Sequence, residues 1–314
     1  MSTTVVLGAT GGAGRALVAH LAATGRPVRA VSRRPAPPQP GVEVVAADVT
    51  DPGSLRWALS GAAVVHHAAQ PVYTRWDLFP TMTAGIADAA ARAGARLVLA
   101  DNLYAHGPVD GPITESTPLA ATDRKGRIRA QMARDLLDRH TRGDLEVVLG
   151  RASDHLGPGV TRSAFGDPLV GRALAGKSVQ ALASADQPHS VGYLPDVAAA
   201  LVTLGEAPGA AGRAWNLPVP PPVTVRELAA LVAAELGRPV RVSVARPALL
   251  RALGLAVPVL REVAATVHQW DRPFVVDDSA YRHSFGPVEP TALPVAVRRT
   301  LAGWGMPSAT AVWA

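Results

Sequence analysis

Residues 8–14 read Gly-Ala-Thr-Gly-Gly-Ala-Gly, and this stretch decides the fold. It follows the apolar run Thr-Thr-Val-Val-Leu at 3–7, which predicts a buried strand, and it precedes an apolar pattern at 15–23 that predicts a helix. Glycines let the backbone of such a turn approach a pyrophosphate, and the first turn of a helix offers free N–H groups and a positive dipole. This context predicts a dinucleotide-binding site formed by Gly8, Thr10, Gly11, Gly12, Ala13 and Gly14.

Short β-branched runs alternate with alanine-rich helical segments through the first half of the chain. These runs are apolar on both sides, as strands of a buried parallel sheet must be. After 5–7, strands are predicted at 28–31, 42–47, 63–66, 97–100 and 146–149, with a helix at 82–93. The alternation predicts an α/β fold of the Rossmann type, which is a doubly wound parallel sheet covered by helices on both faces.

The second half of the chain has a looser pattern. Prolines cluster at 218–222, and helices are predicted at 225–236 and 247–253. We expect a Rossmann domain over 1–155 and a smaller C-terminal substrate lobe, mainly over 156–314, with some of its segments returning to the sheet.

The composition excludes several classes of protein. The chain has 314 residues, of which 48% are hydrophobic and 18% charged, so it can bury a large core and is too apolar to be disordered. It has no cysteine, which excludes disulfides, thiolate metal sites and cysteine nucleophiles and agrees with a cytoplasmic location. The run 248–266 is interrupted by charged residues and a proline, so we expect no membrane span and no membrane partner.

The formal net charge is +6, and the basic residues are spread along the chain. A nucleic-acid-binding protein usually concentrates such charge and interleaves aromatic residues, which make up only 4% here. The charge therefore favours a small anionic ligand over nucleic acid. The composition of a GC-rich gene would explain it equally well.

The residues that end the next strands indicate which dinucleotide is bound. Arg33 and Arg34 end the second strand, where an acidic residue would bind the ribose of NAD, and arginines there suit the 2′-phosphate of NADP. We therefore expect NADP, while NAD stays possible if both arginines belong to a solvated loop. Asp48, followed by Val49, is placed to bind the adenine, and Ala68 and Ala69 let the chain pass beneath the cofactor.

With these motifs the chain resembles the extended or atypical short-chain dehydrogenases/reductases, the NAD-dependent epimerase/dehydratase family. The resemblance covers nearly the whole chain and implies a Rossmann domain with the substrate under a small C-terminal lobe. The residues that carry it are Gly8, Gly11, Gly14, Asp48, Ala68, Ala69, and the segments 151–158, 193–198 and 215–217.

The family's catalytic motif is altered in this chain. The resemblance implies a serine or threonine after the fifth strand and a Tyr-x-x-x-Lys on the next helix, where the tyrosine exchanges a proton with the substrate oxygen and the lysine binds the nicotinamide ribose. No Tyr-x-x-x-Lys occurs in the chain. Asn102 takes the serine position, Lys125 the tyrosine position and Arg129 the lysine position.

Several residues remain candidates for handling the proton. Lys125 can donate one if burial and neighbouring cations lower its pKa, whereas Arg129 is always protonated and can only hold ribose or phosphate. Tyr104 is the alternative acid, on the same side as Asn102 if that segment is extended, and Asn102 can orient a carbonyl. A further alternative is that the relay is lost and these residues are structural. Cations crowded at a helix N-terminus predict an anionic neighbour, such as the cofactor or an acidic substrate.

Four further residues are candidates for the substrate pocket. Tyr73 and Trp76 follow the fourth strand at the carboxyl edge of the sheet, where ligands bind in such folds. His155 follows the sixth strand, and Tyr193 lies in the predicted lobe. Packing between the two parts of the chain would explain the aromatic residues equally well.

Three other patterns were weighed and predict no site. Residues 171–178 match the P-loop pattern, but a helix-like stretch at 168–175 precedes the lysine and a predicted strand at 179–182 follows it, which is the wrong order. The nine histidines lack metal-ligand spacing, so no metal is expected. No Gly-x-Ser-x-Gly occurs, which argues against a serine hydrolase.

These features predict an NADP-dependent oxidoreductase that acts on a carbonyl or hydroxyl of a small organic metabolite. One alternative is a redox-neutral epimerase, dehydratase, isomerase or cyclase that retains bound NAD(P), for example in secondary metabolism. Another is a non-catalytic NADP-sensing protein. The resemblance also implies a possible homodimer.

Overall fold

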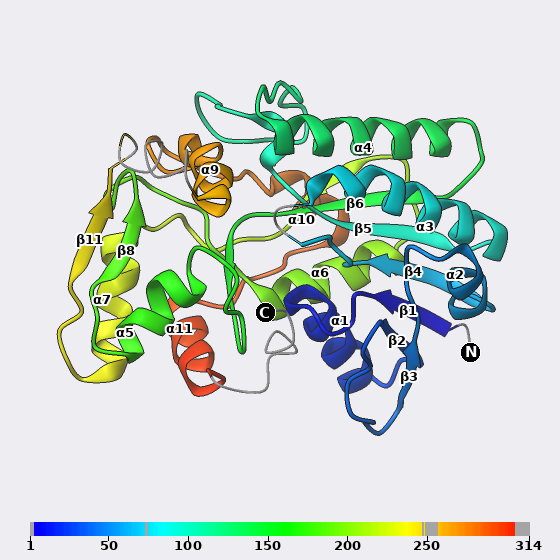
Figure 1. Cartoon of the computed structure of the whole chain (residues 1–314), viewed down its shortest axis with the longest axis horizontal. Helices are drawn as coiled ribbons and strands as arrows, with labels where there is room; N and C mark the ends of the chain where they lie inside the picture. Colours follow the sequence, from blue (N-terminus) through cyan, green and yellow to red (C-terminus); the bar gives the residue numbers. More distant parts are fainter. Residues whose placement is uncertain (1–2, 73–74, 247, 249–256, 305–314) are drawn as a thin grey trace.

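The computed structural model describes residues 3–72, 75–246, 248 and 257–304. Its centre is a seven-stranded parallel sheet in the order β3-β2-β1-β4-β5-β6-β10 (Figure 1). The strands are β1 (Thr3–Leu7), β2 (Val28–Ser32), β3 (Val42–Ala46), β4 (Ala62–His67), β5 (Arg96–Asn102), β6 (Val147–Ala152) and β10 (Ala214–Asn216). The order reverses direction at β1 and β4, so the carboxyl ends of these strands form the crevice in which such sheets bind ligands.

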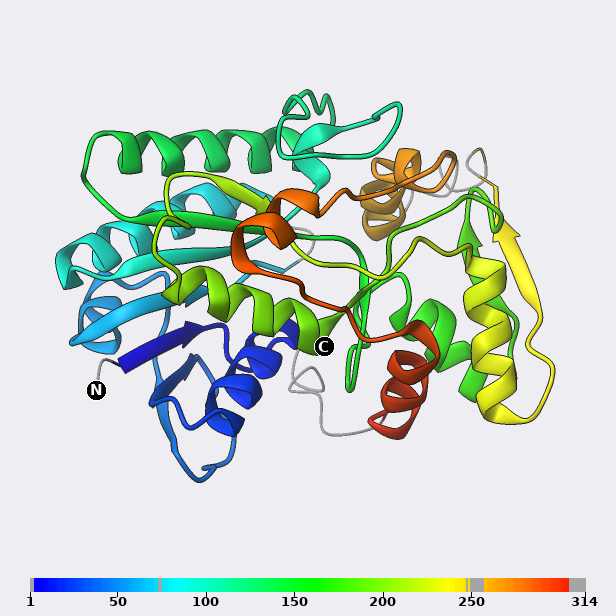
Figure 2. The same ribbon diagram turned by 180° about the vertical axis from the view of Figure 1, so that it is seen from behind.

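Helices cover both faces of the sheet, as predicted (Figures 1 and 2). One face carries α2 (Pro52–Ala58), α3 (Phe79–Ala93) and α4 (Arg124–Thr141). The other carries α1 (Gly12–Ala23), α6 (Leu194–Glu206) and α10 (Ser279–Phe285). Both β10 and α6 come from the second half of the chain, so that half completes the sheet as well as forming the lobe.

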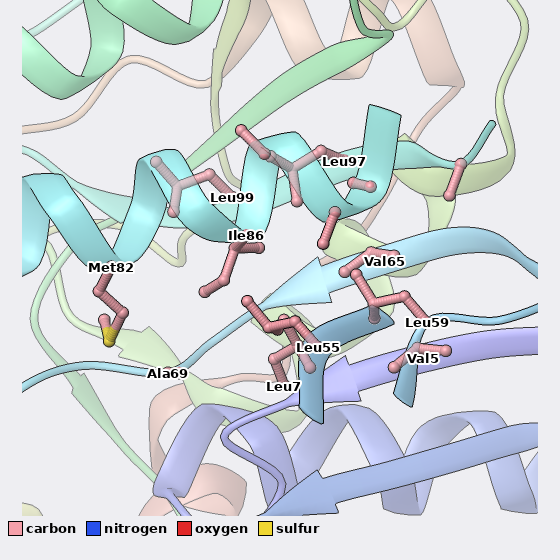
Figure 3. Packing of buried hydrophobic residues seen from close by; sticks show 14 of the residues in the cluster. Val5, Leu7, Leu55, Leu59, Val65, Ala69, Met82, Ile86, Leu97 and Leu99 are labelled. Atoms are coloured by element: carbon pink, nitrogen blue, oxygen red, sulfur yellow. The ribbon is translucent and has the colours of Figure 1, made fainter. Parts of the chain in front are cut away.

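Alternate residues of the central strands feed the two cores. Val5 and Leu7 pack under α2 and α3, while Val6 packs on the side of α1 and α6. Figure 3 shows the first of these cores, in which Leu97 and Leu99 of β5 meet Ile86 of α3. The prediction that strands are apolar on both sides is confirmed for the central strands. It is wrong for β3, which lies at the sheet edge and turns residues such as Glu43 toward solvent.

The smaller lobe packs around its own apolar core, beside the sheet. It contains the π-helical turn η3 (Gly166–Gly171), α5 (Arg172–Leu174), α7 (Val225–Leu236), α9 (Pro258–Ala264), η4 (Val267–Gln269), α11 (Leu293–Ala302) and two strand pairs, β8 (Val179–Leu182) with β11 (Val242–Ala245) and β7 (His155–Leu156) with β9 (Gly192–Tyr193). The helix predicted at 225–236 is confirmed: Thr224 and Glu227 form a capping box at its start, and Gly237 ends it in the left-handed conformation.

Two other expectations about this lobe have different outcomes. The helix predicted at 247–253 falls on residues outside the described ranges, apart from residue 248. The segment that matches the P-loop pattern follows the expected order, because α5 ends before Gly176 and β8 begins at Val179. Within the described ranges, no helix combines the length and the apolarity needed to cross a bilayer.

Truncation of a leucine in the core of Figure 3 should cost far more stability than truncation of an exposed leucine. Leu99 is 1% exposed, whereas Leu78 is 42% exposed. Leu99→Ala leaves a buried cavity and should lower the free energy of unfolding by about 2–5 kcal/mol. Leu78→Ala should change it by less than about 0.5 kcal/mol. Denaturant titration of both variants tests this, and equal losses would contradict the packing described.

Candidate functional site

The glycine-rich turn between β1 and α1 is built by close backbone approach. Gly8 has a φ of +79°, and a Cβ on Gly14 would lie 2.1 Å from the carbonyl oxygen of Gly8. Helix α1 starts at Gly12 without a side-chain cap and without an acidic residue in its first turn. In contrast, Asp51 caps α2 and Asp123 caps α4. The first N–H groups of α1 are thus left for an anion, which fits the pyrophosphate of a dinucleotide.

The other predicted cofactor residues gather around this turn. A Cβ on Gly8 would lie 2.6 Å from the Cα of Ala69, so the chain after β4 passes directly beneath the turn. Arg33 and Arg34 are exposed just after β2, which is hydrogen-bonded to β1. Asp48 accepts hydrogen bonds at Oδ1 from the N–H and hydroxyl of Thr50, at 2.8 and 2.7 Å. These bonds, followed by the nearby Arg33 guanidinium, lower the pKa of Asp48 and keep it an anionic acceptor.

The first turn of α4 is pressed against the end of β5. Asp123 accepts from the N–H groups of Lys125 and Gly126, each at 3.0 Å. A Cβ on Gly126 would lie 2.5 Å from the carbonyl oxygen of Tyr104, which begins the short turn η2 (Tyr104–His106). The glycine therefore allows the close approach that brings Lys125 beside the residues that follow β5.

Lys125 is a fully buried amine. Its Nζ donates to the carbonyl oxygen of Glu262 at 3.0 Å and lies 3.3 Å from the Oε2 atom of the same residue. The Nζ also lies 5.7 Å from the centroid of the Trp76 ring. Burial lowers the pKa of Lys125 to about 8, even though the Glu262 carboxylate acts to raise it. The lysine can therefore exchange a proton close to neutral pH. A lowered pKa was the condition for a role of Lys125 as an acid.

Arg129 lies one turn further along the same face of α4, as predicted from the spacing. Its guanidinium forms an ion pair with Asp101 at 3.0 Å and lies 4.5 Å from the Phe79 ring centroid. Both side chains of the ion pair are 1% exposed. The anionic neighbours of the cations at the start of α4 thus include two carboxylates of the chain itself, those of Asp101 and Glu262. The expectation from the sequence named only the cofactor or an acidic substrate.

A second arginine shares the Asp101 carboxylate. Arg151 Nε on β6 lies 3.6 Å from Asp101 Oδ2, and its Nη1 lies 3.3 Å from Nε2 of His106. Burial and then Arg151 lower the pKa of His106 to about 4, so this ring is neutral at pH 7. Its Nδ1, 3.2 Å from the carbonyl oxygen of Pro118, must then be the donor. The end of β5 therefore holds two buried guanidinium groups against one carboxylate.

Tyr104 corrects one expectation. The segment after Asn102 is not extended: β5 ends at Asn102 and the chain turns into η2. The Oδ1 atom of Asn102 accepts the N–H of Tyr104 at 3.2 Å, which stabilises this turn. The expectation that the two side chains share one side of a strand is therefore wrong. Tyr104 instead stacks on Trp76, with ring centroids 6.2 Å apart.

Three of the four candidates for the substrate pocket lie in the described part of the chain, and they occupy two separate places. Trp76, in the turn η1 (Trp76–Leu78), contacts Tyr104, Lys125 and Arg129 and thus lies inside the candidate site. His155 and Tyr193 belong to the β7–β9 pair, and Tyr193 is 3% exposed in the core of the smaller lobe. Burial lowers the pKa of His155 and raises that of Tyr193. Tyr73 lies outside the described residues.

Two carboxylates of this site, those of Asp101 and Glu262, were not among the predicted site residues. Asp101 immediately precedes Asn102 at the end of a predicted strand, and this position could have indicated it. Glu262 gave no such signal, because it is 137 residues from Lys125 in the sequence. In the described part of the chain, no group of three or more histidine, cysteine or acidic side chains is arranged to hold a metal ion.

Comparisons with known proteins identify the family and the fold. Residues 4–217 match the family model described as "NAD dependent epimerase/dehydratase family". No curated protein matches the chain. Among solved structures, MoeE5 in complex with UDP-glucuronic acid and NAD is 23% identical, with a TM-score of 0.79 over 96% of this chain and 98% of that chain.

Two further structures show the same fold. The dTDP-glucose 4,6-dehydratase of Bacillus anthracis in complex with NAD is 16% identical, with a TM-score of 0.77 over 97% of this chain and 96% of that chain. The UDP-glucuronic acid 4-epimerase of Bacillus cereus, in complex with a fluorinated substrate analogue and NAD, is 15% identical, with a TM-score of 0.77 over 96% and 98%. Since the family model spans more than half of the chain, the protein is an enzyme that belongs to the NAD dependent epimerase/dehydratase family.

Proposed function

We propose that the protein is an NADP-dependent oxidoreductase that reduces a carbonyl, or oxidises the corresponding hydroxyl, of a small polar metabolite. The observation that carries this proposal is Lys125, a buried amine with a pKa of about 8 in the position of the family's tyrosine. At pH 7 most of this amine is protonated, so it can give a proton to a substrate oxygen. The bound nicotinamide would supply the hydride in the direction of reduction.

The residues around Lys125 support the same chemistry. Arg129 and Arg151 share the single carboxylate of Asp101, which leaves an excess of fixed positive charge at the end of β5. Such charge stabilises the negative oxygen that develops when a carbonyl accepts hydride. Asn102, at the end of the same strand, would orient that oxygen through its amide N–H groups. Tyr104 stays the alternative proton donor.

The residues around the glycine turn support the choice of cofactor. Gly8, Gly11 and Gly14 would hold the pyrophosphate against the uncapped start of α1. Asp48 would accept from the adenine amino group. Arg33 and Arg34 would bind the 2′-phosphate, which favours NADP, although the structural neighbours named above were solved with NAD.

The structural neighbours also guide the choice of substrate. Their names refer to UDP- and dTDP-linked sugars, so nucleotide sugars are the first substrates to test. The same names include an epimerase and a dehydratase, which favours a redox-neutral reaction as the second candidate function. In that case the hydride would return to the substrate.

Gly14 predicts the loss of cofactor binding from a single methyl group. Gly14→Ala places a Cβ 2.1 Å from the Gly8 carbonyl oxygen, so the turn must open. We expect NADPH affinity, measured by calorimetry, to fall by at least about tenfold, or 1.4 kcal/mol. Gly85→Ala in α3 is the matched control, since an added Cβ there has no neighbour within 4 Å. If folded Gly14→Ala bound NADPH with wild-type affinity, the proposal that the dinucleotide binds at this turn would be rejected.

The arginine pair predicts cofactor selectivity. Replacing Arg33 and Arg34 together by serine removes the groups proposed to bind the 2′-phosphate. Hydrogen bonds between charged groups contribute about 1.5–3 kcal/mol, so the Kd for NADPH should rise by about 10- to 100-fold while that for NADH changes by less than about threefold. Replacing Arg92 and Arg142 together by serine removes two exposed arginines at the ends of α3 and α4 and controls for net charge. Equal losses for both cofactors would refute the NADP assignment.

Turnover assays distinguish the two candidate functions. Purified protein is offered NADP(H) or NAD(H) with a panel of nucleotide sugars and simple carbonyl compounds, while nicotinamide absorbance and product mass are both followed. A change in absorbance with each turnover supports the oxidoreductase, whereas product formed at constant absorbance supports the redox-neutral reaction.

The same assay tests Lys125. Lys125→Met should lower kcat by about 100-fold or more, which is the usual contribution of a positioned acid. The chain has one other lysine, the exposed Lys177, and Lys177→Met should leave kcat unchanged. Full activity of Lys125→Met together with loss in Tyr104→Phe would assign the proton to the tyrosine.

A further inference from the structure

Lysine is rare in this chain. Of its 31 lysines and arginines only two are lysines, Lys125 and Lys177, and the other basic residues are arginines. Lys177 is exposed, whereas Lys125 has no exposed surface. The two side chains differ in chemistry, because an amine can lose its proton when buried and a guanidinium keeps it. The protonation of Lys125 therefore depends on the groups that surround its amine.

The group that contacts the Lys125 amine comes from the smaller lobe. Glu262 lies on α9, which in both views is on the side of the lobe nearest the start of α4 (Figures 1 and 2). Its main-chain oxygen and its Oε2 atom both contact the Nζ, at 3.0 and 3.3 Å. Its Oε1 atom lies 3.9 Å from Arg124. One residue of the lobe thus bridges two cations at the start of α4.

Other charged groups lie near this pair but are engaged elsewhere. Asp123 binds the N–H groups at the start of α4 through its Oδ1 atom. Arg129 is paired with Asp101, and the exposed Arg124 contacts Asp77 as well as Glu262. Within the described ranges, the charged or titratable groups around the amine come from α9, from α4 with its cap, and from η1 and η4. They contact the amine directly or through one of these neighbours, and they include Glu262, Asp123, Arg124, Arg129, Asp77 and His268.

Exposure differs between the two partners. The Lys125 side chain is 0% exposed and the Glu262 side chain 13% exposed. A proton that replaces one given up by the enclosed amine must pass through a neighbouring group, and the Glu262 carboxylate reaches both the amine and solvent. We propose that Glu262 is a positioning residue for Lys125, so that the proton-handling group of the site is a pair assembled from both lobes.

This inference rests on the proposed role of Lys125 in proton transfer, and the proton balance is simple. In the direction of reduction, an N–H bond of the Lys125 ammonium breaks as the O–H bond of the product forms. The Glu262 carboxylate then takes a proton from solvent and passes it to the neutral amine, which restores both the ammonium and the carboxylate. In the direction of oxidation each transfer runs in reverse.

The pair can be tested in the protein without any ligand. Lysine labelled with ¹³C at the ε carbon gives two resonances, and Lys177→Arg assigns them. We expect the Lys125 resonance to titrate with a midpoint near the pKa of about 8. Glu262→Gln keeps the size of the side chain but removes the negative charge, which disfavours the ammonium. The midpoint should therefore fall by about one unit, a tenfold change in the protonation equilibrium.

Glu235→Gln is the matched control, because Glu235 pairs with Arg298 in the smaller lobe and does not contact Lys125. It should leave the Lys125 midpoint unchanged. In Glu262→Asp, which keeps the charge, the Lys125 midpoint should lie between those of Glu262→Gln and the wild type. An unchanged midpoint in folded Glu262→Gln would overturn the inference. This readout needs no turnover, so it stands or falls independently of the proposed oxidoreductase activity.

Turnover provides the second readout. Because Lys125 must be protonated to act as an acid, kcat for reduction should fall as pH rises through the Lys125 midpoint. In Glu262→Gln this fall should begin about one pH unit lower, with KM changed by less than about twofold. A merely structural Glu262 would lower kcat equally at every pH. A shifted resonance with an unshifted rate profile would therefore reject a role of the pair in proton transfer.

Discussion

The carboxylate of Asp101 is the group on which the candidate site depends. It lies between Arg129 of α4 and Arg151 of β6, and all three side chains are buried. A buried guanidinium that loses its counter-charge typically destabilises a protein by about 3–5 kcal/mol, so this carboxylate is what allows either arginine to lie inside. Because Arg129 is one turn from Lys125, the same ion pair fixes the start of α4 against the sheet.

Arginine and lysine divide two tasks at this site. A guanidinium group carries a permanent positive charge in proteins. Asp101 pairs with both Arg129 and Arg151, and the Phe79 ring packs against Arg129. Lys125 is the cation whose charge can change near neutral pH, because burial opposes its ammonium. In the proposed function, this pairing of a titrating amine with a guanidinium would keep a proton donor beside a positive charge.

Local patterns in the sequence were sufficient for six of the seven strands of the sheet, for the glycine turn and for the shared face of Lys125 and Arg129, but not for β10. Period-two and helical spacing involve residues a few positions apart, so they predict strands such as β1 and helices such as α7 directly. They do not reveal contacts between distant segments. The pairing of Lys125 with Glu262 depends on how α9 packs. The turn at Tyr104 is local, but it involves a side-chain oxygen of Asn102 that accepts the Tyr104 N–H, which hydrophobic spacing does not encode.

The two helices that begin at the site differ in how their first N–H groups are used. The first N–H groups of α1 meet no side-chain cap, so that helix end is suited to a diphosphate. At α4, Asp123 already binds the first N–H groups and offsets the positive end of the dipole. Positive charge at α4 is therefore carried by the Lys125 and Arg129 side chains, which lie deeper, beside the end of β5. Under the proposed function, a phosphate would bind at the first helix and a reacting oxygen at the second, so the two would not compete for one site.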